Sequence, residues 1–290
     1  MPHSISGKTA FVTGAARGIG AAVAQELARR GASVALVGLE AEQLAEQASS
    51  LGAGHLWVEA DVTDQRALAA AVEATVERFG GIDVVIANAG VASLGTVHTA
   101  DPDEAAHTIA VNLVGVYRTA AATVPALAAS HGYLLVVASL ASLGPLPGGA
   151  AYAASKAGVE SLAGTLRIEL AADGIAVGSL HPSWIDTVLL RDAEAGSAAV
   201  RRMRAAMRWP LRTTTSVQDC AVAVADAVER RATRVYVPPS TAVLGLLRPV
   251  LQSPAVHRLI ASRAQRDLRE LDAERRSGTP PGTAGGTPTG

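Results

Sequence analysis

"TGAARGIG" (residues 13–20) stands between a short apolar run and an alanine-rich stretch. Its glycines, Gly14, Gly18 and Gly20, permit a tight strand-to-helix turn whose backbone N–H groups can approach a pyrophosphate. The positive end of the helix dipole that follows favours the same anion. No Lys-Ser/Thr pair follows the glycines, so the turn is not a P-loop. Its place at the first turn of an alternating strand–helix pattern predicts a nucleotide site and not an ordinary glycine-rich loop.

Short β-branched runs alternate with helical stretches along the chain. The expected strands are 9–14, 33–38, 55–62, 83–90, 133–139, 175–182 and 234–237. The expected helices are 20–31, 40–51, 64–79, 103–130, 151–172 and 217–231. The strands are apolar almost throughout, as in a parallel sheet that is covered on both faces. The pattern predicts a doubly wound, Rossmann-type α/β fold with helices on both faces.

Two segments depart from this alternation. Residues 183–216 interrupt the sheet before its last strand, and a long insertion of this kind is often a lid. Residues 241–276 form a C-terminal helical extension, and residues 277–290 are a Gly/Thr/Pro tail expected to be disordered. We therefore expect one dinucleotide-binding catalytic domain over 1–240, followed by the extension and the tail.

Composition excludes several classes of protein. Of 290 residues, 49% are hydrophobic and 18% charged, so a substantial core can form. The formal net charge is −1 and no basic stripe is present, which argues against nucleic-acid binding. The chain shows no secretory signal pattern and no apolar run near the roughly 20 residues of a membrane helix. A single cysteine, Cys220, fits a reducing compartment, and we expect a cytoplasmic protein.

Several further motifs follow the glycine turn in a fixed order. They are "ADV" (60–62), "NAG" (88–90), Asn112, Ser139 and the Tyr152-x-x-x-Lys156 pair. Together with the spacing Gly-x-x-x-Gly-x-Gly, this set resembles the short-chain dehydrogenase/reductase family in its single-domain branch, over about residues 6–240. The resemblance implies an NAD(P)-dependent oxidoreductase that transfers hydride between nicotinamide and a secondary alcohol or ketone.

The resemblance implies a catalytic set of four residues. Tyr152 and Lys156 project from one helix face, and the ammonium, with the charge of the oxidised nicotinamide, would lower the pKa of the phenol toward the working pH. Without the other motifs, the pair would be a packing aromatic beside a snorkelling lysine. Ser139 would donate a hydrogen bond to the substrate oxygen. Asn112 would serve a water-linked proton relay to the lysine, bridge helix backbone as a structural amide, or do both.

The cofactor contacts also follow from the resemblance. Asp61 would bond the adenine amine, although a turn-forming role is its alternative. Asn88 would be mainly structural, and Gly90 would leave room for the ribose. Ser183 stands where the family usually has a glycine, so the local backbone path is expected to differ there. The implied cofactor-binding set is Gly14, Arg17, Gly18, Ile19, Gly20, Asp61, Val62, Asn88, Gly90, Tyr152, Lys156, Ile185 and Thr187.

The choice of dinucleotide depends on the end of the second strand. An acid there would bond the ribose 2′-hydroxyl and repel a 2′-phosphate. Gly38 occupies that place, and the acid Glu40 comes two residues later. Arg17 could pair with a phosphate, or be a solvated charge at the helix end. The sequence favours NADP, with NAD as the alternative.

The insertion suggests an apolar substrate. It carries Val188, Leu189, Leu190, Met203, Met207 and Trp209, and "LGPLPGG" (143–149) adds another apolar wall. These residues would line a site for a medium-sized alcohol or ketone, or pack the lid on the sheet.

Partners beyond the substrate are also constrained. The extension carries an apolar stripe at helical spacing: Val256, Leu259, Ile260, Ala264, Leu268 and Leu271. Acidic residues offset its arginines, which argues against a membrane surface and favours packing on the core or on a second subunit. Family habit implies a homodimer or homotetramer through the helices that bear Asn112 and Tyr152. A catalytically silent NADP(H)-sensing protein is the rival function, and the intact Ser-Tyr-Lys set argues against it.

Overall fold

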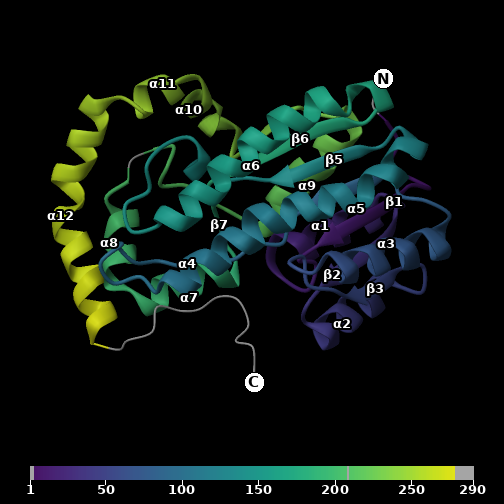
Figure 1. Ribbon diagram of the computed structural model, residues 1–290, viewed down its shortest axis with the longest axis horizontal. Coiled ribbons are helices and arrows are strands. Elements are labelled where there is room, and N and C mark those ends of the chain that lie inside the picture. Colours follow the sequence, from purple (N-terminus) through teal and green to yellow (C-terminus); the bar gives the residue numbers. More distant parts are fainter. Residues whose placement is uncertain (1–2, 208, 278–290) are drawn as a thin grey trace.

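The computed structural model describes residues 3–207 and 209–277. A seven-stranded, all-parallel sheet in the order β3-β2-β1-β4-β5-β6-β9 forms its centre (Figure 1). The strands are β1 (Thr9–Thr13), β2 (Ser33–Gly38), β3 (Leu56–Glu59), β4 (Val84–Ala87), β5 (Tyr133–Val137), β6 (Ala176–Pro182) and β9 (Arg234–Val237). Each overlaps one of the seven strands expected from the sequence. The strand order reverses between β1 and β4, which is where such sheets bind their ligands.

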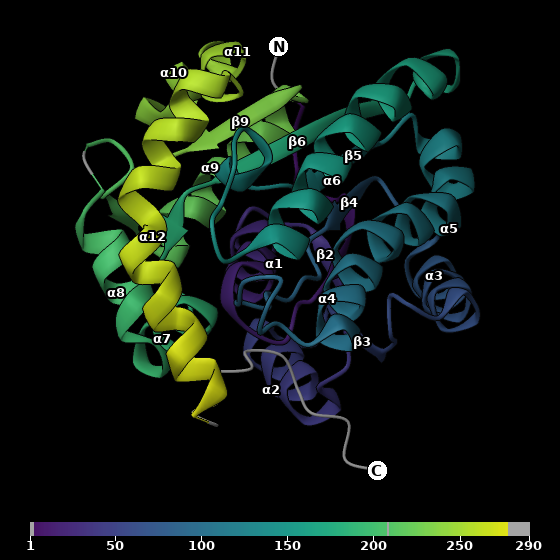
Figure 2. The same ribbon diagram turned by 60° about the vertical axis from the view of Figure 1, so that its left-hand side comes forward.

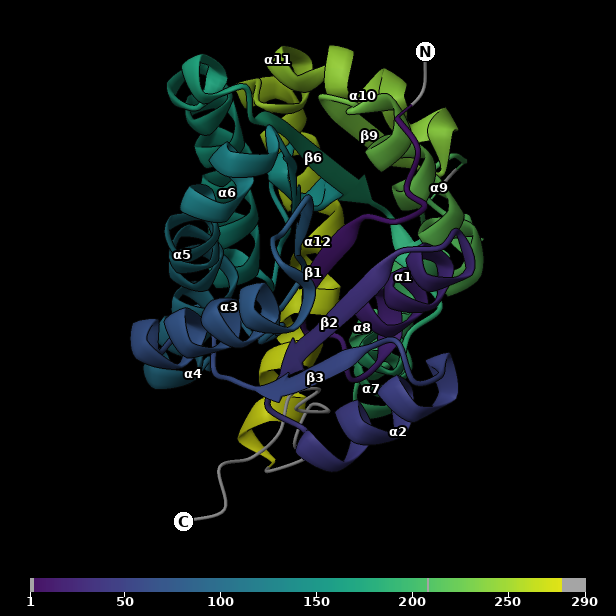
Figure 3. The ribbon, with the colours of Figure 1, turned by 90° about the vertical axis from the view of Figure 1, so that its right-hand side faces the viewer.

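Helices cover both faces of the sheet (Figure 3). One face carries α1 (Gly18–Arg29), α2 (Ala41–Leu51) and α9 (Val217–Arg230). The other carries α3 (Gln65–Phe79), α4 (Pro102–Ile109), α5 (Gly115–Ser130) and α6 (Ala150–Glu169). Phe11 and Val12, adjacent in β1, are both fully buried and belong to opposite cores. Because successive side chains of a strand point to opposite faces, this two-sided burial explains the uninterrupted apolar strands.

The expected helix 103–130 is not a single regular helix. A π-helical segment, Ala110–Val114, separates α4 from α5 and carries Asn112. Local widening of a helix to the i→i+5 pattern is frequent at functional sites. Nothing in the amino-acid pattern of this segment predicts the change in helix type.

The lone cysteine behaves as a small core residue. Cys220 lies in α9 and is fully buried in the core that α9 shares with α1. Burial raises the pKa of its thiol to about 12, so the thiolate is not formed at neutral pH.

The insertion after β6 forms its own small substructure. It contains β7 (Trp184–Ile185), α7 (Val188–Gly196), α8 (Ala198–Ala205) and β8 (Thr214–Thr215), and β7 pairs with β8. After β9 come α10 (Ala242–Leu246), α11 (Arg248–Leu251) and the long α12 (Pro254–Arg276). Figure 2 shows α12 lying along α8, on the side of the molecule away from α3.

Acidic residues of α12 fix it to the rest of the fold. Glu274 accepts from the Ser197 hydroxyl at 2.6 Å and from the Ala198 amide at 3.0 Å, at the start of α8. Asp272 accepts from the Thr96 and Thr99 hydroxyls at 2.6 and 2.7 Å, in the loop after β4. The extension therefore links the insertion, at the start of α8, to the loop that follows β4.

Across the ranges that the structure describes, no helix is both long enough and apolar enough to cross a membrane.

Candidate active site

The glycine turn has the geometry that a pyrophosphate site requires. Gly14 and Gly18 have φ of 63° and 60°, in the left-handed region that favours glycine. A Cβ on Gly20 would lie 2.1 Å from the Gly14 carbonyl oxygen, so no larger residue fits there. Arg17, the N-cap residue of α1, caps no backbone N–H with its side chain, and the first turn of α1 has no acid. The N–H groups at this helix end are therefore available to an anion, and the residues present fit a dinucleotide.

Asn88 holds the turn in place, as the sequence suggested. Its side-chain nitrogen donates to the carbonyl oxygens of Thr13 and Gly14, at 2.9 and 3.2 Å. The Asn88 amide in turn donates to the Thr13 hydroxyl at 3.0 Å. These bonds tie the end of β4 to the end of β1, so the role of this side chain is structural.

Asp61 and Val62 follow the carboxyl end of β3, at the same edge of the sheet as the glycine turn. Asp61 accepts from the Thr63 amide at 2.7 Å, which is the turn-forming contact that was its alternative role. Val62 is buried and packs against Leu68 and Val111. A contact of Asp61 with adenine stays a prediction.

The expected catalytic pair meets the expected catalytic serine. The Ser139 hydroxyl lies close enough to Tyr152 to act on the pKa of its phenol. Lys156 is buried, and its Nζ lies 5.8 Å from the centre of the Tyr152 ring. The same Nζ donates to the carbonyl oxygen of Val137 at 2.8 Å, near the end of β5. Helix α6 thus presents both side chains to the edge of the sheet that carries Ser139.

The electrostatics differ from the expectation for Tyr152. Burial raises the pKa of the phenol, and the hydrogen bond with Ser139 opposes that shift. Burial also lowers the pKa of Lys156 to about 8. The side chains of the protein alone therefore keep the phenol protonated at neutral pH. Such a phenol can act as a proton donor.

Both polar atoms of the Asn112 side chain have partners, in the Val91 backbone and the Ser155 side chain. Its Nδ2 donates to the Val91 carbonyl at 2.9 Å and to the Ser155 hydroxyl at 3.1 Å, and its Oδ1 accepts from the Val91 amide at 2.8 Å. These contacts are those of a structural bridge, one of the two roles expected from the sequence, and a part in a proton relay stays a prediction. A Cβ on Gly90 would lie 3.2 Å from Asn112 Oδ1 and 3.5 Å from Lys156 Nζ. A larger residue at position 90 would therefore press on Asn112 Oδ1, while the lysine would be in ordinary van der Waals contact.

A cavity of ≈ 380 Å³ opens beside Ser139 and Tyr152. Ile19, Ile185 and Thr187 line the same cavity, and the Thr187 methyl would lie 3.6 Å from a Cβ on Gly18. The cavity therefore reaches from the glycine turn to the expected catalytic residues. Most of its wall is apolar and includes Leu94, Leu143, Leu146, Leu189, Leu190, Met203, Met207, Leu244, Leu251, Ile260 and Leu271.

Two parts of this wall were missed by the sequence analysis. Leu244, Leu251, Ile260 and Leu271 come from the C-terminal extension, whose apolar stripe was assigned only to packing. Arg204 of α8 is the one charged residue that lines the cavity within the described ranges, and it pairs with Glu194 and Thr214. Val188 and Trp209, expected in the wall, do not line it, and Trp209 is 77% exposed.

Arg17 and Glu40 face each other next to the glycine turn. The Arg17 guanidinium lies 3.5 Å from a Glu40 carboxylate oxygen, and both side chains are partly exposed. A Cβ on Gly38 would have no neighbour closer than 3.7 Å, where the first atom is Glu40 Oε2. The carboxylate of Glu40 therefore reaches the end of β2, where the sequence alone predicted no acid.

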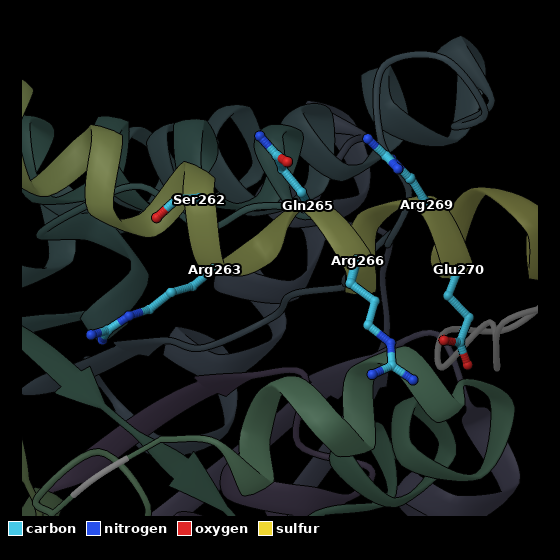
Figure 4. Close-up of a pocket in the computed structure, with 6 residues that line it drawn as sticks. All are labelled: Ser262, Arg263, Gln265, Arg266, Arg269 and Glu270. Atoms are coloured by element: carbon cyan, nitrogen blue, oxygen red, sulfur yellow. The ribbon is translucent and has the colours of Figure 1, made fainter.

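A second hollow, of ≈ 450 Å³, lies on the outer side of α12 (Figure 4). Its six lining residues, among them Arg263, Arg266 and Arg269, all come from this one helix. None of them lines the cavity at Ser139 and Tyr152. This hollow is therefore separate from the candidate active site.

Comparison with known proteins identifies the family. The family model described as "short chain dehydrogenase" matches residues 8–198. The chain belongs to this family. It is 40% identical to trans-4-hydroxycyclohexanecarboxylate dehydrogenase of Sinomonas cyclohexanicum over 201 residues, which cover 66% of this chain and 78% of the relative. It is 36% identical to the cis-4-hydroxycyclohexanecarboxylate dehydrogenase of the same organism over 230 residues, covering 78% and 90%.

A solved structure agrees with the family assignment. The 3-ketoacyl-(acyl-carrier-protein) reductase of Brucella melitensis, solved with NADH, superposes with a TM-score of 0.73 at 29% identity. The match covers 81% of this chain and 98% of that one. The chain is thus an NAD(P)-dependent oxidoreductase with a Rossmann-like fold, and its cofactor is a nicotinamide dinucleotide.

Proposed function

We propose that this short-chain dehydrogenase interconverts a secondary alcohol and a ketone, with Tyr152 as the general acid and base. The observation that carries the proposal is that Tyr152 and Ser139 meet at a cavity that also reaches the glycine turn. A nicotinamide bound there supplies or accepts the hydride. The chain itself then has to orient the substrate oxygen and move one proton.

Each of these tasks has a side chain. Ser139 would donate a hydrogen bond to the carbonyl oxygen, where negative charge develops during reduction. Tyr152, protonated at neutral pH, would deliver the proton to the same oxygen. Lys156 would contact the cofactor ribose, as the family resemblance implies. Its bond to Val137 holds the ammonium beside the phenol, where the charge favours the phenolate left after proton transfer.

We propose NAD as the preferred cofactor, although the sequence alone favoured NADP. The Glu40 carboxylate beside Arg17 offsets the charge that would attract a 2′-phosphate, and it can accept a hydrogen bond from a 2′-hydroxyl. Two relatives of the chain from Mycobacterium tuberculosis are named NAD-dependent oxidoreductases.

The substrate is proposed to be an uncharged, apolar alcohol or ketone of medium size. The cavity of ≈ 380 Å³ has a mainly apolar wall, and such pockets bind apolar molecules through a few fixed polar groups. The cyclohexanecarboxylate dehydrogenases act on substrates with a carboxylate, for which Arg204 could be a partner. In this chain Arg204 is already paired with Glu194, which leaves little net positive charge for a second carboxylate.

The remaining predictions concern organisation. We propose a catalytic domain over 1–240, in which segment 183–216 acts as a substrate lid. The extension over 241–276 is proposed to complete that lid. The expected tail is 277–290, and all of it except Ser277 lies outside the described residues. We also propose a cytoplasmic homo-oligomer formed through α5 and α6. Tyr117 and Ile168 support that interface, because these apolar side chains are 58% and 80% exposed on the two helices.

One assay tests the proposed reaction. Alicyclic secondary alcohols and ketones are supplied with NAD(H) or NADP(H), and turnover is followed at the nicotinamide absorbance. Each carboxylate in the panel is matched by its methyl ester. We expect turnover with NAD(H) and a preference for the esters. Binding of NADH without turnover of any substrate would instead favour the silent sensor.

A further inference from the structure

The outer side of α12 carries arginines that form no ion pair with another residue that the structure describes. They are the exposed residues Arg258, Arg263, Arg266 and Arg269. The last three are spaced three residues apart, so their side chains line one side of the helix. Figure 4 shows these three side chains extending from α12 around the hollow of ≈ 450 Å³. Guanidinium groups gathered in this way offer a binding surface for anions.

The acids of α12 do not neutralise these arginines. Glu270, which also lines the hollow, and Asp267 form ion pairs with Arg202 of α8. Asp272 and Glu274 accept hydrogen bonds from hydroxyl groups in the loop after β4 and at the start of α8. The sequence alone predicted that the acids would offset the arginines and keep the extension away from a membrane. The structure instead engages the acids with the protein, so positive charge stays on the outer side.

Apolar side chains are exposed on the same part of the molecule. Leu246 of α10 is 84% exposed, and Leu247 and Val250, before and within α11, are 43% and 54% exposed. Leu259 of α12, directly after Arg258, is 48% exposed. Figures 1 and 2 show α10 and α11 next to the N-terminal end of α12. Exposed apolar groups that gather beside free cations mark an interaction surface.

We propose that α10, α11 and the outer side of α12 bind the surface of an anionic phospholipid bilayer. The arginines meet the negative headgroups, and the leucines enter the boundary between headgroups and acyl chains. Charge selects this partner over a second copy of the chain, because a twofold axis on this side would oppose arginine to arginine. A nucleic acid would engage the arginines, but it would leave Leu246 and Leu259 without an apolar partner.

The same three helices also line the substrate cavity with other side chains. Leu244 of α10, Leu251 of α11 and Ile260 of α12 belong to its wall. The bilayer therefore lies against one side of the segment and the cavity against another. A bilayer dissolves apolar alcohols and ketones, so it would hold such molecules next to this wall. That consequence rests on the proposed function, whereas the membrane binding itself does not.

Co-sedimentation of the full chain with sucrose-loaded vesicles tests the binding without cofactor or substrate. We expect the chain to sediment at low salt with vesicles of equal parts phosphatidylcholine and phosphatidylserine, and to stay in solution with pure phosphatidylcholine. Salt at about 1 M should release most of it, because the Debye length then falls to about 3 Å. No sedimentation at low salt overturns the proposal, and so does equal sedimentation with the two vesicle compositions.

Removal of two charges locates the surface on α12. We expect Arg266→Gln combined with Arg269→Gln to weaken binding to the anionic vesicles by about tenfold or more, since each basic residue near such a surface contributes roughly fivefold. The matched control is Arg66→Gln combined with Arg78→Gln, which removes the same charge from exposed sites of α3, away from α12 (Figure 2). An equal loss of binding in the two double variants contradicts the proposal.

An apolar replacement and two rival partners complete the test. We expect Leu246→Ser to weaken binding to the anionic vesicles by about fivefold, whereas Val76→Ser, at a less exposed site of α3, leaves it unchanged. If the unaltered chain binds duplex DNA in fluorescence anisotropy but no vesicle at the same salt, a nucleic acid replaces the bilayer as partner. If Leu246→Ser lowers the mass measured by light scattering, a second copy covers this surface, and the proposal is wrong.

Discussion

The Lys156 ammonium donates a hydrogen bond of 2.8 Å to the carbonyl oxygen of Val137, the last residue of β5, two residues before Ser139. This bond fixes the lysine beside the Tyr152 ring rather than on its hydroxyl. The helix that supplies the acid–base residue is therefore tied to the strand that supplies the substrate-binding serine. Their relative position is set by backbone and buried side chains, and not by solvent-exposed contacts.

Removal of the phenol oxygen tests the proposed acid–base role. We expect Tyr152→Phe to lower kcat by about 10³-fold, because the variant lacks the hydroxyl proposed to deliver the proton, and to leave NADH affinity largely intact. Steady-state kinetics measures the change in kcat, and a cofactor fluorescence titration measures the affinity for NADH. Tyr117→Phe, an exposed tyrosine on α5, is the matched control and should keep full activity. Normal turnover of Tyr152→Phe would refute the mechanism.

The buried lysine should weaken the fold while it serves catalysis. Because burial lowers the pKa of Lys156 to about 8, the unfolded chain binds more protons between that value and the usual pKa of lysine. The contribution of this group to the free energy of unfolding therefore increases as pH rises through that window, and the cost is fully present below it. We expect Lys156→Met to have a free energy of unfolding about 2 kcal/mol higher than that of the unaltered chain at pH 7, and to lose turnover. Denaturant melts at pH 7 and pH 9 measure this, and the difference between the variants should narrow at the higher pH. Lys8→Met, at a partly exposed site, should keep its turnover.

The pair of Arg17 and Glu40 should set the cofactor preference. We expect Glu40→Gln to shift the ratio of NADPH to NADH affinity by about tenfold toward NADPH, because one charged contact with the phosphate is worth roughly that factor. Fluorescence titration with both cofactors gives the ratio. Glu42→Gln, two residues further along and exposed, should leave it unchanged. If Glu40→Gln leaves the ratio of NADPH to NADH affinity unaltered, the Glu40 carboxylate does not determine the cofactor preference.

The extension should control substrate size. Leu271 of α12 is 2% exposed and lines the cavity, whereas Leu259 of the same helix is 48% exposed. We expect Leu271→Ala to cost about 2–3 kcal/mol of stability and to lower KM for bulkier ketones, because it enlarges the cavity. Leu259→Ala should change neither. Equal substrate profiles for the two variants would show that α12 is not part of the substrate site.

The exposed side chains of α5 should mark a subunit contact. We expect Tyr117→Asp to lower the mass measured by light scattering to that of a smaller assembly, because a charge would be buried without a partner. Val97→Asp places the same charge at a loop residue that is 89% exposed, and it should not change the mass. A monomeric unaltered chain would contradict the predicted homo-oligomer at once.

Local spacing carried most of what could be predicted. The glycine turn and the pair at 152 and 156 depend on residues within one or two helical turns, and Ile19 of the turn and Tyr152 of the pair line one cavity. The seven strands followed from uninterrupted apolar runs. The π-helical segment at Asn112 could not be foreseen, because its composition differs little from that of regular helix.

Contacts between distant segments were the part that the sequence concealed. The pairing of Arg204 with Glu194, which offsets the positive charge at the cavity, depends on how α7 and α8 fold back on each other. The raised pKa of Tyr152 arises from burial, which spacing along one helix does not show. The acids of α12 were counted as neutralising its arginines, yet Asp272 and Glu274 face Thr96, Thr99 and Ser197 instead.

The placement of α12 has a consequence for how the molecule is made. Its residues are translated after every strand of the sheet, so the nucleotide half can be complete on the ribosome while the substrate chamber still lacks a side. A nascent chain at that stage would hold its dinucleotide but expose the leucines and methionines of the unfinished chamber to water and to chaperones.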